Sequence, residues 1–113
     1  MKQPASIANA EHYNWGNVCD GWHLMRSESV SVIEERMPSG SEEQRHWHAR
    51  SRQFFYVLEG ELTMVFDDRA VALQPRHGIE IAPGEPHQAK NRSDADTRFL
   101  VISSPPSHGD RHI

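Results

Sequence analysis

The stretch from Gly40 to Gly60, GSEEQRHWHARSRQFFYVLEG, carries the most information in this chain. It places His46 and His48 two residues apart, and in a β-strand such a pair projects to one side while Trp47 points to the other. Two imidazoles on one side can share one metal cation. The stretch therefore predicts part of a metal site on an extended segment.

The second half of this stretch is a β-prone run that begins at Gln53. Gln53 lies an odd number of residues after His48, so the two face the same side only if residues 49–52 form a turn. The inward face would then continue with Phe55 and Val57. The outward positions form an apolar row that suggests a subunit contact. These outward residues are Phe54, Tyr56 and Leu58.

A third histidine, His87, follows the segment Pro-Gly-Glu-Pro at residues 83–86. Proline restricts the backbone and glycine permits unusual angles, so this segment can aim His87 inward from a fixed bend. Closure of a barrel would bring it to His46 and His48. The three side chains then form one candidate site.

The rest of the chain consists of short β-prone runs separated by turn signals. The predicted strands are 29–37, 54–58, 61–66, 70–73, 79–82 and 97–103. Turns at 59–60 and 67–68 predict an antiparallel meander, and Asp20-Gly21 predicts the tight turn of a hairpin. No segment shows sustained helical periodicity, so the fold class is all-β, a barrel or sandwich.

The length of 113 residues has room for one domain only. We expect residues 1–15 to form an irregular arm anchored by Tyr13 and Trp15, and residues 104–113 to form an extended tail. Apolar residues make up only 36% of the sequence, so we expect core burial to be shared in a homodimer.

Charge and cysteine content exclude several classes of function. The net charge is −4 and no basic block is present, which argues against nucleic-acid binding. The first ten residues lack the apolar core of a signal peptide and no apolar run approaches the ~18 residues of a membrane span, so we expect a soluble cytoplasmic protein. Cys19 is the only cysteine, which excludes sites built from several thiolates, and we expect it to be a core residue.

These residues resemble the two motifs of the cupin superfamily. The first motif, G-x5-H-x-H-x4-E-x6-G, is matched at Gly40, His46, His48 and Gly60, with Gln53 in place of Glu. The second, which ends P-x-G-x-x-H-x-x-x-N, is matched at Gly84, His87 and Asn91; Arg76 replaces its initial glycine and Ala82 its first proline. The resemblance spans residues 30–102. It implies a single-domain cupin, a jelly-roll-like double-stranded β-helix that binds a divalent metal through His46, His48, Gln53 and His87.

The glutamine also resembles a narrower group, the small cupins of aromatic polyketide biosynthesis, which includes cyclases. Three imidazoles and an amide leave a divalent cation its full charge, so the site should favour an anionic small-molecule substrate. Zinc is the first expectation, with Fe, Ni, Mn, Co and Cu also compatible with these ligands. Gln53 has a second reading, as a hydrogen-bond partner of a ligand or of water rather than a ligand itself.

Four functions fit these ligands. Lewis-acid chemistry would serve an aldol-type ring closure of a polyketide, and a redox-active metal would serve an oxygen-dependent dioxygenase. A non-catalytic small-molecule binding module and a sugar isomerase are the other two. The sequence places no carboxylate pair in the pocket, so the general base is unassigned.

Three arginines surround the histidine pair, where they could gather an anionic substrate, and five histidines lie outside the ligand positions. We expect them to be solvated loop charges or structural histidines. They are Arg45, Arg50, Arg52, His12, His23, His77, His108 and His112.

Overall fold

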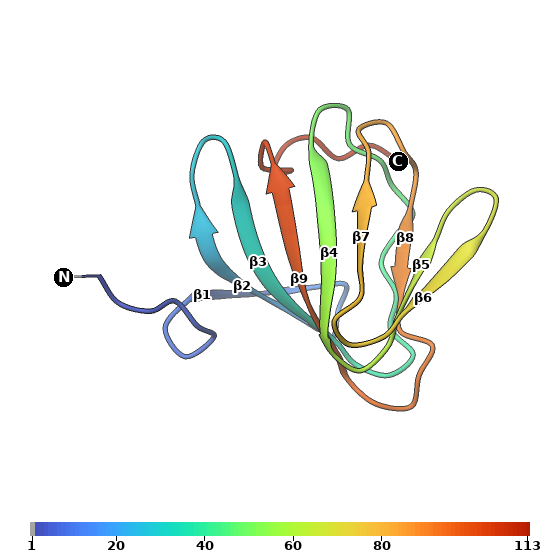
Figure 1. The fold of residues 1–113 in the computed structure, drawn as a ribbon, viewed down its shortest axis with the longest axis horizontal. Coiled ribbons are helices and arrows are strands. Elements are labelled where there is room, and N and C mark those ends of the chain that lie inside the picture. The colour runs from blue at the N-terminus through green and yellow to red at the C-terminus, as the bar shows by residue number, and fades with distance from the viewer. Residues whose placement is uncertain (1) are drawn as a thin grey trace.

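The chain forms two antiparallel β-sheets with the core between them (Figure 1). The computed structural model describes residues 2–113, and over that range no helix long and apolar enough to cross a membrane is present. The strands are β1 (Glu11–Trp15), β2 (Cys19–Arg26), β3 (Ser31–Met37), β4 (Arg52–Glu59), β5 (Leu62–Val65), β6 (Ala70–Leu73), β7 (Gly78–Ile81), β8 (Gln88–Lys90) and β9 (Thr97–Ser104). The all-β jelly-roll prediction is confirmed, and each of the six predicted strands is present with ends shifted by at most two residues.

The strands divide between the sheets in a way that corrects the predicted meander. The six-stranded sheet has the order β1-β2-β3-β9-β4-β7 and the three-stranded sheet the order β6-β5-β8. β5 and β6 form the expected hairpin, but β4 pairs with β7 and β9 rather than with β5. Gly60, at a φ of +81°, turns the chain from one sheet to the other. β4 and β5 therefore lie in different sheets and can direct apolar side chains into the same core from opposite sides.

The N-terminal hairpin differs from its prediction. Residues 11–15 are a regular strand, β1, and the turn to β2 lies at residues 16–18. Asp20 and Gly21 are within β2, where Gly21 is paired with Tyr13. A Cβ on Gly21 would lie 2.2 Å from Cζ of Tyr13, so the glycine makes room for the tyrosine ring rather than forming a turn.

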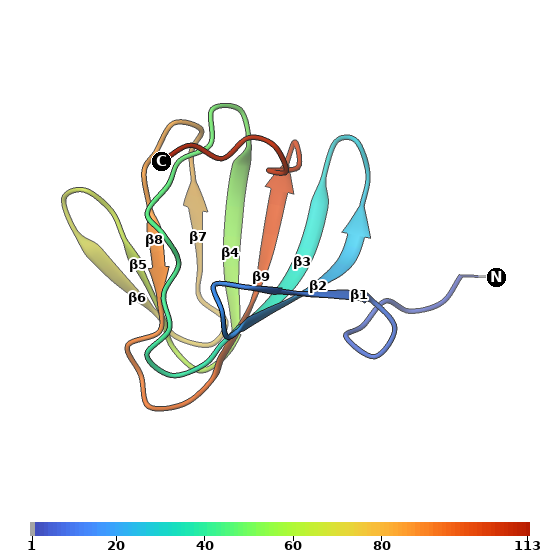
Figure 2. The ribbon, with the colours of Figure 1, turned by 180° about the vertical axis from the view of Figure 1, so that it is seen from behind.

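Residues 41–48 act as an irregular edge strand beside β8, and Figure 2 shows the two segments side by side. The peptide groups of Gly40 and Ser41 pair with Asn91, and Glu43 N–H donates to the carbonyl of Ala89. His46 and His87 exchange both backbone hydrogen bonds, at 3.0 and 2.9 Å. This pairing places the first and the third histidine directly opposite each other.

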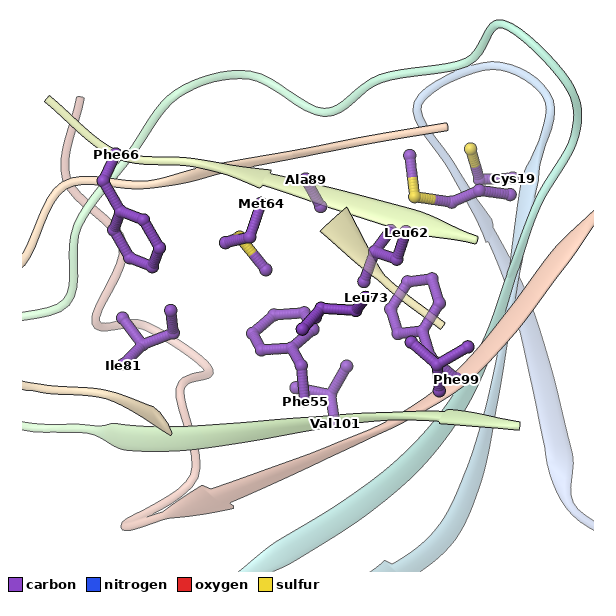
Figure 3. Packing of buried hydrophobic residues seen from close by; sticks show 12 residues of the cluster. Cys19, Phe55, Leu62, Met64, Phe66, Leu73, Ile81, Ala89, Phe99 and Val101 are labelled. Carbon is purple, nitrogen blue, oxygen red and sulfur yellow. The ribbon is translucent and has the colours of Figure 1, made fainter. Parts of the chain in front are cut away.

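A buried apolar cluster fills the space between the sheets (Figure 3). Alternation along β4 directs Phe55 and Val57 into it, as predicted, while Phe54 and Leu58 are about two-fifths exposed on the outside. Cys19 is fully buried, which confirms its core role. The same alternation continues to Gln53, so the inward face of β4 runs from the core into the candidate site.

The two departures from the second cupin motif have local structural solutions. Arg76 occupies the glycine position at a φ of +70°, a left-handed conformation that costs a residue with a Cβ about 1–2 kcal/mol. Its N–H bonds to the carbonyl of Val57 at 2.8 Å, which ties this turn to β4. Ala82, at the proline position, donates its N–H to Oε1 of Glu85 at 3.1 Å, a bond that proline would not form.

Candidate metal centre

Three histidines converge where residues 41–48, the edge segment, pair with the residues that lead into β8. His46, His48 and His87 are all buried, and one ring nitrogen of each lies within 4.8 Å of the other two. The ring centroids are 4.5 Å apart for His46 and His87, 4.9 Å for His46 and His48, and 5.6 Å for His48 and His87. The grouping predicted from the sequence is thus present, and it has a size that one cation can fill.

Hydrogen bonds set the tautomer of each imidazole. Nδ1 of His46 donates to the carbonyl of Gln44 at 2.8 Å, and Nδ1 of His87 donates to that of Glu85 at 2.9 Å. Nδ1 of His48 donates to the carbonyl of Asp110 at 2.5 Å. A carbonyl can only accept, so each Nδ1 carries the proton and each Nε2 keeps its lone pair. Nε2 of His48 and of His87 are buried without any hydrogen-bond partner.

Gln53 completes the group. Its Nε2 donates to Oγ of Ser103 at 3.0 Å, and this bond fixes the amide with its oxygen free. Oε1 is buried and has no partner. A buried amide oxygen without a hydrogen bond is costly. Gln53 lines the same cavity as His46 and His48, so its oxygen is a candidate fourth donor of an N3O metal site. The donor set therefore fits a divalent cation.

Burial also favours the uncharged form of His46 and His87. It lowers the pKa of His46 to about 4, and it lowers the pKa of His87 in the same direction. A neutral imidazole is the form that binds a metal, so near neutral pH no proton has to be displaced from these two rings.

A cavity of about 280 Å³ opens beside His46, His48 and Gln53, and its lining corrects the expectation of a site without carboxylates. Glu35 from β3 and Glu43 from the edge segment both line it. Oε2 of Glu35 accepts a 3.2 Å hydrogen bond from the Tyr13 hydroxyl, and Oε2 of Glu43 accepts one from Ala89 N–H at 2.8 Å. The pocket thus contains two carboxyl groups that sequence reasoning did not place there.

Burial raises the pKa of both carboxyl groups, and the charge of Glu43 adds to the shift at Glu35. Burial, and then the neighbouring charge of Glu43, raises the pKa of Glu35 to about 8. Burial raises the pKa of Glu43 to about 7. Burial and the charge of Glu35 also raise the pKa of the Tyr13 hydroxyl. Perturbed groups of this kind gather at catalytic sites more often than elsewhere.

The C-terminal residues form one wall of this cavity, a role that the sequence did not indicate. Ser107, His108, Gly109 and Arg111 all line it. Among the described residues that line the cavity, Arg111 is the only lysine or arginine. Arg45 pairs with Asp67 and Arg52 pairs with Glu80, and neither arginine lines the cavity. The expectation that those two arginines lie outside the site fits this geometry. His108 is exposed, as expected for a surface histidine, and it also lines the cavity.

A second cavity of about 460 Å³ adjoins the first through four shared residues, Tyr13, Ile33, Ser107 and His108. His23 and Arg26 of β2 line it. Nδ1 of His23 is buried without a partner, while the residue as a whole is half-buried. The two spaces therefore share one wall beside the candidate site.

Known proteins resemble this chain over most of its length. The cupin domain family matches residues 33–103. An uncharacterized protein of Methanocaldococcus jannaschii is 33% identical over 92 residues, which cover 80% of this chain and 74% of the relative. Polyketide synthase CurC of Streptomyces cyaneus is 30% identical over 69 residues, or 61% of this chain and 45% of that protein, so the chain spans less than half of CurC.

Solved structures support the fold without selecting a reaction. The polyketide cyclase RemF from Streptomyces resistomycificus superposes with a TM-score of 0.80 at 22% identity, covering 94% of this chain and 81% of RemF. A predicted oxalate decarboxylase from Thermotoga maritima and a sugar phosphate isomerase from Silicibacter pomeroyi superpose similarly, with TM-scores of 0.81 and 0.79. The family match, the two motifs and the double-sheet architecture agree, and the chain belongs to the cupin family.

Proposed function

We propose that this cupin is a metal-dependent enzyme that acts on a small carbonyl-rich or phenolic anion, in an aldol-type ring closure of the kind used in polyketide synthesis. One observation carries the proposal: a cluster of three histidines with unprotonated Nε2 atoms opens through His46, His48 and Gln53 onto a cavity that two carboxyl groups also line. The names of CurC and RemF support the choice of reaction.

His46, His48 and His87 would hold the metal through Nε2, and Gln53 through Oε1. We propose zinc, which supplies Lewis-acid polarisation of a substrate carbonyl oxygen and needs no redox partner. All four donors are neutral, so they leave the positive charge of the site undiminished for an anionic substrate. The neutral ligand set is the feature that separates this site from cupins with Glu at the fourth position.

Glu35 and Glu43 would move the protons. Ring closure with loss of water needs a base that takes two protons in turn from the carbon between two carbonyl groups. It also needs an acid that delivers two protons to the reacting carbonyl oxygen, the first to form the aldol hydroxyl and the second to let that hydroxyl leave as water. Both carboxyl groups face the cavity. Tyr13, hydrogen-bonded to Glu35, can relay a proton through its hydroxyl, and Arg111, which also lines the cavity, can pair with the anion.

The outward face of β4 supports a homodimer. Phe54 and Leu58 are 40% and 42% exposed, and Tyr56 lies between them on the same face. Exposed neighbouring apolar side chains of this size are typical of a protein contact surface. We propose that a second copy of the chain covers them.

The test is incubation of the zinc-loaded protein with a linear aromatic polyketone, with and without dioxygen, followed by mass spectrometry. We expect a product lighter by one water in both atmospheres. Product that appears only with dioxygen and contains its atoms would overturn the cyclase in favour of a dioxygenase, and tight binding without any product would overturn enzymatic function. His48→Ala should abolish turnover, and full activity in that variant would contradict a metal mechanism.

A further inference from the structure

His48 differs from the other two histidines in how its ring is held. His46 and His87 donate Nδ1–H to carbonyl groups two residues earlier in the chain, Gln44 and Glu85. The acceptor for His48 is the carbonyl of Asp110, 62 residues later. The orientation of one proposed ligand therefore depends on a segment that is remote in sequence and close to the C-terminus.

The side chain of Asp110 attaches this segment to the site. Its Oδ1 accepts the N–H of Ala49 at 2.8 Å, and its Oδ2 accepts the N–H groups of Arg50 and Ser51 at 2.8 and 2.9 Å. Asp110 is 4% exposed, and these three donors belong to the turn that directly follows His48. The buried carboxylate of Asp110 thus accepts all three backbone N–H groups of the turn. The backbone carbonyl of the same residue accepts the Nδ1–H of His48, which precedes the turn.

Further contacts keep the same segment in place. Trp47 and His112 exchange two backbone hydrogen bonds of 2.9 Å, and their rings stack with centroids 4.4 Å apart. The hydroxyl of Ser51 donates to the carbonyl of Pro105 at 2.7 Å. The C-terminal tail is therefore a docked strap across the segment that carries His46 and His48.

We infer that Asp110 is a positioning residue for the metal centre: it docks the C-terminal strap so that its carbonyl holds His48 in the Nδ1–H tautomer, with Nε2 aimed at the cation. This inference rests on the proposed metal site, and it adds the strap to that site as a structural part. Loss of the carboxylate would leave three backbone N–H groups without their acceptor and would release the carbonyl from His48.

Metal binding and strap docking are then linked. A ring without its Nδ1 acceptor samples both tautomers and more than one orientation, and the wrong tautomer presents a proton to the metal. Removal of an outer hydrogen-bond partner of a metal-binding histidine typically weakens metal affinity about 10–100-fold. By reciprocity, a bound metal must strengthen docking of the strap by the same factor.

The test compares Asp110→Ala, the milder Asp110→Asn and a control, Asp94→Ala, which removes the same charge from an exposed loop. Zinc affinity is measured by competition with a chelator. Imidazole tautomers are read in the metal-free protein from long-range ¹H–¹⁵N NMR correlations. We expect Asp110→Ala to bind zinc about 10–100-fold more weakly and to show mixed tautomers at His48 alone. Asp110→Asn should show a smaller change in the same direction, and Asp94→Ala should match the wild type.

Two results would overturn the inference. The first is a folded Asp110→Ala variant that keeps the Nδ1–H tautomer of His48 and wild-type zinc affinity. The second is equal loss of order in all three histidines, which would indicate general destabilisation. If Asp110→Ala does not fold, the same two criteria apply to Asp110→Asn. If the wild type binds no zinc, the proposed function fails, while the tautomer of His48 still tests the positioning role.

Discussion

Replacing Glu35 by glutamine should raise the stability of the metal-free protein at alkaline pH. In the folded state the pKa of Glu35 is raised from 4.5 to about 8. An unfolded chain releases that proton near 4.5, so between these pH values the unfolded state binds fewer protons and the free energy of unfolding falls as pH rises. Glutamine has the same shape, still accepts the Tyr13 hydrogen bond and cannot ionise, so it removes this loss.

The size of the effect follows from the shift. At 1.36 kcal/mol per pKa unit the whole shift would correspond to about 5 kcal/mol. Hydration of the cavity makes ionised Glu35 less costly, and part of the shift belongs to the repulsion with Glu43 and not to Glu35 alone. We therefore expect Glu35→Gln to gain about 2 kcal/mol in free energy of unfolding at pH 9 relative to pH 5. Urea unfolding at pH 5, 7 and 9, followed by tryptophan fluorescence, measures the difference.

The matched control is Glu34→Gln, one residue earlier on the opposite face of β3. Glu34 lies on the outer surface and pairs with Arg98 at 3.5 Å. Its removal should change stability by less than about 1 kcal/mol, without the alkaline gain. If Glu34→Gln and Glu35→Gln respond alike to pH, the placement of Glu35 as a buried cavity carboxyl is wrong.

Three further changes test the other parts of the site. Gln53→Glu should cancel part of the metal charge, so benzoate should bind the zinc-loaded protein about tenfold more weakly in calorimetry, while zinc itself should bind more tightly. Unchanged benzoate affinity would argue that Gln53 does not contact the metal. Arg111→Ala should also weaken benzoate binding, by about 3–10-fold, whereas Arg50→Ala, outside the cavity, should not; equal effects would point to a general charge effect. Phe54→Glu should convert the proposed dimer to a monomer in light scattering, and a wild-type monomer at all concentrations would refute the proposed contact.

The strands could be predicted from the sequence because alternation and turn residues are local signals. Their pairing could not, since Glu59-Gly60 looks the same whether it closes a hairpin or carries the chain to a second sheet. β8 was missed because Gln88–Lys90 is short and has one apolar residue, Ala89. The turn assigned to Asp20-Gly21 was wrong because a glycine that makes room for a neighbouring ring has the same appearance in sequence as a turn glycine.

The three histidines were predictable because the spacing within HxH and the bend before His87 carry geometric information. Glu35 was not, since Glu34 and Glu35 are adjacent and only the pairing of β3 decides which faces inward. Register with β9 places Glu35 beside Phe99 on the inner face. The tail residues gave no local signal at all, because Asp110 acquires its partners through tertiary structure.

The most direct test of the metal centre is X-ray absorption spectroscopy of the zinc-loaded protein, with His87→Ala as the comparison. We predict one zinc per chain, with three imidazole nitrogens at about 2.0–2.1 Å and oxygen in the remaining position. His87→Ala should show two imidazoles. Fewer than about 0.1 zinc per chain after metal supplementation, or a zinc environment unchanged by loss of His87, would contradict the account.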